Sequence, residues 1–109
     1  PDLFDGLPFT VLVPRRPAPG RPWAWRPEFL GAFDAVDHLL IEAGWHLLFL
    51  DLPDHYGAPS ARARFGAFLD AQIAAHALAP SGVFIGLSRG GLSALHLACD
   101  RPDLCSALY

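Results

Sequence analysis

The sequence contains no lysine, and charged residues make up only 17% of its 109 positions. Its eight basic residues are all arginines and are scattered along the chain, so they do not form the basic stripe that nucleic-acid binding requires. No apolar run approaches the roughly 18–20 residues of a membrane span. These absences argue against a nucleic acid as a partner and against a membrane-spanning helix.

Cysteine is also scarce, and Cys99 and Cys105 do not form a C-x-x-C pair, which argues against a zinc or redox centre. Free cysteine behaves as a small hydrophobe, so we expect two buried thiols. The sequence also lacks the G-x-G-x-x-G pattern of dinucleotide-binding proteins and the G-x-x-x-x-G-K pattern of phosphate loops. We therefore predict no cofactor and no metal.

Apolar residues, in contrast, are abundant, at 52% of the sequence, which excludes a disordered segment. This content is high for one small domain, because such a domain has much surface to cover with polar groups. We therefore expect residues 1–109 to be part of a larger domain, in which further chain covers some of the apolar surface.

The apolar pattern alternates between helical spacing and short continuous runs. Phe29, Phe33, Val36 and Leu40 recur at spacings of four and three, which is typical of one face of a helix. The run 45–50 is nearly continuous and predicts a strand that is buried on both faces of a parallel sheet. The whole pattern predicts strands at 9–13, 45–50, 83–85 and 104–109, and helices at 28–43, 60–79 and 88–100.

Two segments interrupt this pattern and are predicted to be loops. Residues 14–27 include five prolines, and a loop of this length in a compact domain is often functional. Residues 51–57 form the second loop. The alternation of strands and helices predicts an α/β fold with a parallel sheet and helices on both faces, which is a three-layer α/β/α arrangement.

Residues 86–90 read Gly-Leu-Ser-Arg-Gly and fit the pattern G-x-S-x-G. A predicted strand leads directly into the motif and a predicted helix leads directly out of it, which is the context of a nucleophile elbow. On such a tight turn the serine hydroxyl stands clear of the sheet, and the glycines avoid clashes. The positive end of the helix dipole also points at the site. We therefore predict that Ser88 is a nucleophile; the alternative is a helix N-cap in another doubly wound fold.

The motif and its position in the chain resemble the α/β-hydrolase superfamily. The resemblance implies a truncated hydrolase fold with the spatial strand order 4-3-5-6, in which strands three to six are residues 9–13, 45–50, 83–86 and 104–109. The loop 51–60 resembles one that often follows the fourth strand. The run 22–26, Pro-Trp-Ala-Trp-Arg, resembles a subgroup of bacterial esterase-like members that are often found near polysaccharide-degrading enzymes.

The resemblance also implies an oxyanion hole with two backbone donors. One is the N–H of Arg89, the residue after the nucleophile. The other belongs to the loop after the first strand, within Trp23, Ala24 and Trp25. Donors that point at the developing oxyanion lower the barrier, because they stabilise charge that appears only in the transition state.

Three more residues are candidates for contact with a substrate. Arg26 either binds an anionic substrate group or pairs with Glu28 or Asp54. His55 and Tyr56 lie in the loop after the second parallel strand, at the edge where a parallel sheet places its site. We therefore expect substrate contacts from both loops.

A serine nucleophile needs a base within reach and an acid that orients the base. In the superfamily the acid and then the histidine follow the serine along the chain. After Ser88 the only histidine is His96, which lies eight residues into the predicted helix and about 12 Å along its axis. Asp100 and Asp103 are equally misplaced. We therefore expect the acid and the histidine beyond residue 109, and negligible hydrolase activity from residues 1–109 alone.

These features predict a serine hydrolase that cleaves small-molecule esters through an acyl-enzyme on Ser88, with acylated carbohydrates as one substrate class. A prolyl-oligopeptidase-like peptidase or an acyltransferase would use the same machinery. A non-catalytic binding module is the alternative from a different class. Fold does not decide among them, whereas an acid and a histidine after later strands would favour the enzyme.

Overall fold

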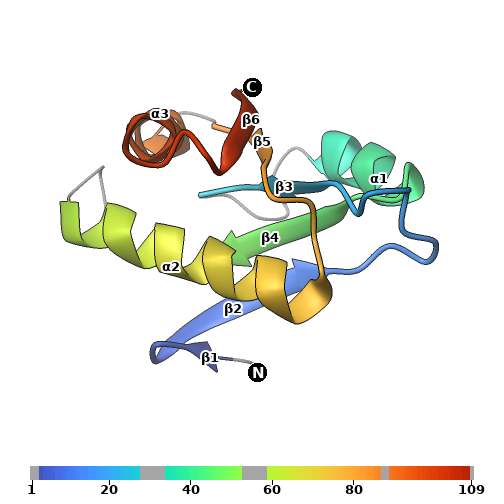
Figure 1. Ribbon diagram of the computed structural model, residues 1–109, viewed down its shortest axis with the longest axis horizontal. Helices are drawn as coiled ribbons and strands as arrows, with labels where there is room; N and C mark the ends of the chain where they lie inside the picture. Colours follow the sequence, from blue (N-terminus) through green and yellow to red (C-terminus); the bar gives the residue numbers. More distant parts are fainter. Residues whose placement is uncertain (1–2, 28–33, 53–58, 87–88, 109) are drawn as a thin grey trace.

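The computed structural model describes residues 3–27, 34–52, 59–86 and 89–108 (Figure 1). In this part of the chain a mixed sheet of six strands packs against three helices, so the fold is α/β, as predicted. The elements in chain order are β1 (Leu3–Phe4), β2 (Leu7–Leu12), β3 (Trp23–Trp25), α1 (Asp34–Glu42), β4 (His46–Leu50), α2 (Pro59–His76), β5 (Gly82–Phe84), α3 (Arg89–Asp100) and β6 (Cys105–Leu108).

The strands lie in the order β1-β2-β4-β3-β5-β6. Strands β4, β3, β5 and β6 are parallel, as predicted, whereas β2 is antiparallel to both β1 and β4. The prediction of a wholly parallel sheet is therefore wrong at this edge. Asp5 and Gly6 both have positive φ and join β1 to β2 in a tight hairpin. Residues 13–22, which connect β2 to β3, contain no helix.

The middle of the sheet, between β4 and β5, is occupied by residues 23–25, which we predicted to be part of a loop. Residues 9–13, predicted to be the third strand of the hydrolase order, instead contribute to β2 on the far side of β4. Both predictions are wrong for one physical reason. Three residues are too few to show the two-residue period of a strand, and the flanking Pro22 and Pro27 are typical of a loop.

The described ends of the other predicted elements are confirmed to within three residues. Strand β4 is buried along its length except for half-buried Phe49. Helix α2 buries Phe65, Phe68 and Leu69, as its apolar spacing predicts. The predicted helix at 28–43 is described from Asp34 onward, and residues 28–33 lie outside the described residues.

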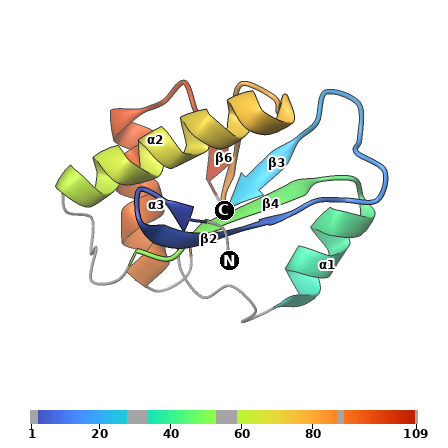
Figure 2. The ribbon, with the colours of Figure 1, turned by 90° about the horizontal axis from the view of Figure 1, so that it is seen from below.

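The sheet has a separate apolar cluster on each face. On one face Trp23 and Trp25 pack with residues of α2 and α3, among them Phe65 and Leu97. On the other face Ala24 lies with Leu47 and Ile85, and the residues of α1 that cover them are Leu40 and Ile41. Figure 2 shows α1 and α2 on opposite sides of β3 and β4. Successive side chains of β3 therefore point to opposite faces, with Trp23 and Trp25 in one cluster and Ala24 in the other.

Helix α1 ends at a glycine that also holds the preceding loop in place. Gly44 has a φ of 92°, and its N–H donates to the carbonyl of Ile41, while the N–H of Trp45 donates to that of Leu40. This pair of bonds satisfies carbonyls at the helix end. The N–H of Ala18 donates to the Gly44 carbonyl at 2.9 Å, so the loop before β3 is bonded to the turn after α1.

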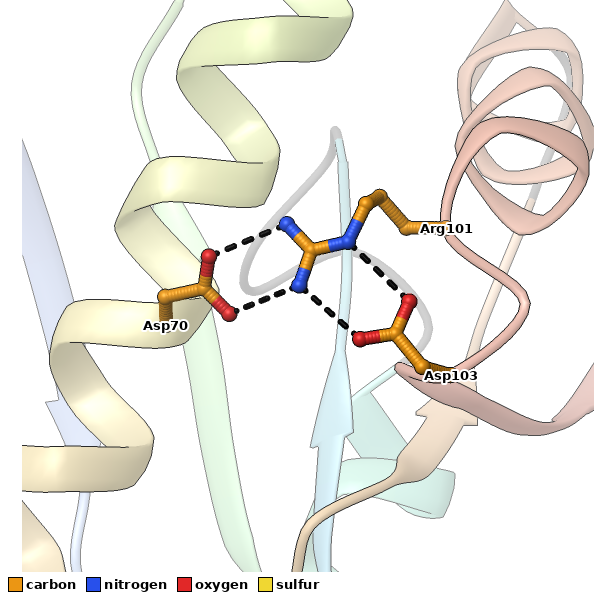
Figure 3. Close-up of polar contacts among 3 residues, drawn as sticks. All are labelled: Asp70, Arg101 and Asp103. Carbon is orange, nitrogen blue, oxygen red and sulfur yellow. Dashed lines mark hydrogen bonds and ion pairs between the residues drawn. The ribbon is translucent and has the colours of Figure 1, made fainter.

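Polar contacts connect α2 to the segment after α3. The guanidinium of Arg101 lies between Asp70 of α2 and Asp103, with four contacts of 2.9–3.0 Å (Figure 3). Asp103 occupies the turn before β6, as predicted. The prediction of two buried thiols is wrong, because Cys99 is exposed on α3 and Cys105 is half-buried at the sheet edge. None of the described helices has the length and apolar character needed to cross a membrane.

Candidate active site

The connection between β5 and α3 is short. Strand β5 ends at Phe84 and α3 begins at Arg89, so only residues 85–88 join them. Gly86 is half-buried in this connection. Ser88, the predicted nucleophile, lies outside the described residues. A strand and a helix therefore flank these four residues, which is the arrangement that a nucleophile elbow requires.

The carboxyl ends of three parallel strands meet beside this connection. The N–H of Ile85 donates to the carbonyl of Trp25 at 2.9 Å, and the N–H of Arg26 donates to the carbonyl of Leu48 at 3.0 Å. The hydrogen bonds between the strands therefore continue one residue past β3, at Arg26, and one residue past β5, at Ile85. Ligands of parallel sheets bind outside these carboxyl ends, so the edge next to residues 85–88 is the candidate site.

Trp23, Ala24 and Trp25 lie within the sheet, and their side chains are fully buried. Their backbone pairs with β4 on one side and with β5 on the other. Sequence reasoning assigned their N–H groups to an oxyanion hole in a loop, but the structure assigns these residues to a strand. The N–H of Arg26 is bonded to Leu48, and Pro27 has no N–H. Neither Arg26 nor Pro27 therefore offers a free backbone N–H at this edge.

Arg26 follows β3 directly and is buried at the candidate edge. Its Nε lies 3.0 Å from Oδ1 of Asp37 in α1, and the two side chains are only 3% and 7% exposed. Sequence reasoning considered Glu28 and Asp54 as partners, and both lie outside the described residues. The pair with Asp37 favours the structural role that we weighed for Arg26.

Asp37 was missed by sequence reasoning, although the sequence carries a signal for it. Asp37 precedes Leu40 and Ile41 by three and four positions, so it shares the face of α1 that packs on the sheet. A carboxylate on an apolar helix face is rarely buried without a partner. Its position therefore indicated a buried cation nearby.

His46 and His76 lie far from the predicted elbow. His46 begins β4 and His76 ends α2, and their ring centroids are 5.8 Å apart. The start of a parallel strand is at the opposite edge from its carboxyl end, where the elbow is predicted. Burial, followed by the nearby His76 and Arg21, lowers the pKa of His46 below its usual value.

His96 and His38 lie on helices. His96 is half-buried on α3, and its Nδ1 contacts Nη1 of Arg62 at 2.6 Å, which agrees with its predicted place on the helix face. His38 is exposed on α1. The loop residues His55 and Tyr56, predicted to contact substrate, lie outside the described residues. Within the described ranges no group of three or more His, Cys, Asp or Glu side chains forms a candidate metal site.

The sequence matches no protein-family model, no curated protein and no solved structure.

Proposed function

We propose that the chain carries the nucleophile of an α/β-hydrolase-type serine enzyme, Ser88, and that the enzyme cleaves esters through an acyl-enzyme. The observation that carries the proposal is the connection of β5 to α3 by residues 85–88, which contain Gly86 and Ser88 of the G-x-S-x-G motif. A strand–turn–helix unit around this motif is the context in which the serine acts as a nucleophile.

The order of the parallel strands supports the same proposal. The resemblance to the superfamily implies the spatial order 4-3-5-6, and the parallel strands here lie in the order β4-β3-β5-β6. Residues 23–25 take the place that we first gave to residues 9–13. Helices on both faces of the sheet are compatible with the three-layer arrangement that the superfamily implies.

In the proposed reaction Oγ of Ser88 attacks the ester carbonyl and forms a tetrahedral oxyanion. Collapse of this intermediate breaks the bond to the alcohol, which leaves with a proton, and water then hydrolyses the acyl-enzyme. Arg89 is the first residue of α3, so its backbone N–H belongs to the helix turn whose amides have no intrahelical partner. We propose this N–H as one oxyanion donor, and a residue after Pro27 as the other.

We propose acylated carbohydrates as the substrate class, on the resemblance of residues 22–26 to esterase-like proteins. His55 and Tyr56 are proposed to contact the substrate from the loop after β4. The acid and the histidine of the triad are proposed to lie outside residues 1–109. His46, His76 and His96 support this, because each lies at the far edge of the sheet or contacts another helix.

The test is a single-turnover reaction of Ser88 with a fluorophosphonate probe. Oγ forms a bond to phosphorus, fluoride leaves, and solvent base takes the hydroxyl proton at alkaline pH. Residues 1–109 and their Ser88→Ala and Ser93→Ala variants are treated alike, and tandem mass spectrometry locates the adduct. Ser93 is a matched control because it is a buried serine of the same helix, α3.

We expect one adduct, on Ser88, in the wild type and in Ser93→Ala, and none in Ser88→Ala. An elbow serine is expected to react faster than other serines because the oxyanion donors also stabilise the charge on the phosphoryl oxygen. Equal labelling of Ser88 and other serines would reject the proposed nucleophile.

A further inference from the structure

Arg26 and Asp37 form a buried ion pair between the end of β3 and helix α1. Nε of Arg26 lies 3.0 Å from Oδ1 of Asp37, and almost none of either side chain is exposed. Taking two charges out of water is costly, and replacing such a pair by apolar residues of similar volume is often neutral or stabilising. Stability alone therefore does not explain why this position holds charges.

The apolar contacts of α1 with the sheet have no preferred direction. Leu40 and Ile41 pack on the cluster of Ala24, Leu47 and Ile85. Apolar burial depends on the area that is covered and is non-directional, so it permits a helix to shift along the sheet. A guanidinium has a rigid, planar set of donors, so its pairing with a carboxylate is directional. The ion pair therefore adds a directional contact between α1 and the end of β3.

The same arginine lies beside the strand that leads to the proposed nucleophile. The Arg26 N–H is bonded to Leu48 of β4, and the carbonyl of the preceding Trp25 accepts the N–H of Ile85. Ile85 is three residues before Ser88. Neighbouring strands are about 4.8 Å apart, so the pair is anchored one strand away from the β5–α3 connection.

We propose that Arg26 and Asp37 are positioning residues for Ser88. Their ion pair holds α1 against the carboxyl end of β3, one strand away from the β5–α3 connection, and so fixes the backbone beside the proposed nucleophile. Neither side chain needs to contact the substrate. This inference rests on the proposed function, because it assigns the pair to the reactivity of that serine.

The experiment compares Ser88 labelling with stability in matched variants. Asp37→Asn removes the buried charge at constant shape. Asp70→Asn is its control, because it removes an equivalent carboxylate from an exposed pair with Arg101. The double variant Arg26→Met, Asp37→Leu replaces the buried pair with apolar side chains. The rate of fluorophosphonate labelling and the urea midpoint are measured for each variant.

We expect Asp37→Asn and the double variant to label about tenfold to a hundredfold more slowly, since a displacement of about 1 Å costs that much in rate. Asp70→Asn is expected to label at the wild-type rate, and the double variant to keep the wild-type urea midpoint. If the pair had only a structural role, the variants would have a lower urea midpoint, but their folded form would be labelled at the wild-type rate.

Three results would overturn the inference. Wild-type labelling in the folded double variant would leave Ser88 as the nucleophile but remove the positioning role. A double variant that does not fold, or equal slowing in Asp37→Asn and Asp70→Asn, would assign the pair to stability. Equal labelling of Ser88 and other serines in the wild type would reject the proposed nucleophile and this inference together.

Discussion

Trp23 donates its indole N–H to the carbonyl of Ala79 over 2.8 Å, and its ring lies directly against Gly82. The bond joins the middle strand of the sheet to the chain between α2 and β5. Ala79 in turn donates its N–H to the carbonyl of Arg21. Because the indole is fully buried and bonded at its tip, the ring has little freedom to move away from Gly82.

The first prediction concerns the space at Gly82. A Cβ at this position would lie closer than 3.0 Å to three ring atoms of Trp23, so Gly82→Ala is expected to lower the free energy of unfolding. Overpacking of this kind costs about 2–3 kcal/mol. The control is Gly66→Ala in α2, where the nearest atom is 3.5 Å away, and which is expected to stabilise by about 0.5–1 kcal/mol. Urea unfolding measures both, and similar values for the two variants would contradict the argument.

The second prediction concerns the end of α2. Ala77 has a φ of 52°, and the next residue, Leu78, donates its N–H to the carbonyl of Ile73. A left-handed conformation is unfavourable for alanine, so Ala77→Gly is expected to raise the free energy of unfolding by about 0.5–1 kcal/mol. Ala75→Gly, within the helix, is instead expected to lower the free energy of unfolding by about 0.5–1 kcal/mol. A loss of stability in Ala77→Gly would show that the turn gains nothing from glycine.

The third prediction concerns pH. Burial, His76 and Arg21 lower the pKa of His46, so the unfolded chain binds a proton at His46 at a higher pH than the folded protein does. The stability contributed by uncharged His46 is therefore present above pH 6.5, the ordinary pKa of histidine, and is lost as the pH falls below that value. His46→Phe is expected to show a smaller loss between about pH 6.5 and pH 5 than the wild type. Denaturant unfolding at each pH measures the loss.

A matched substitution separates His46 from the other histidines. His38 is exposed on α1, so His38→Phe is expected to keep the pH dependence of the wild type. Equal pH profiles for the wild type and His46→Phe would mean that His46 does not carry the effect.

The fourth prediction concerns the two thiols. Burial raises the pKa of Cys105, whereas Cys99 is exposed on α3. The thiolate is the reactive form, so Cys99 is expected to react with iodoacetamide near pH 8 roughly tenfold faster than Cys105. Peptide mapping after timed quenching gives both rates in one sample, and Cys99→Ser should remove only the fast phase. Faster alkylation of Cys105 would contradict the burial described for it.

The sequence by itself determined the elements whose patterns are long enough to read. The nearly continuous apolar run at 46–50 and the helical spacing of α2 are local properties, and each repeats over several residues. The G-x-S-x-G motif between a strand and a helix is local in the same way, because four residues connect the two elements. Such features depend on neighbouring residues in the chain, so no knowledge of the sheet was needed to predict them.

Tertiary structure decided which strand lies in the middle of the sheet and which charges are buried. Residues 23–25 form a strand because β4 and β5 pair with them from both sides, and those partners are distant in the sequence. The antiparallel edge of β2 likewise depends on its pairing with β4. Arg26 and Asp37 form a buried pair because α1 packs on the sheet. Pairing and burial are long-range effects, so a local pattern carries little information about them.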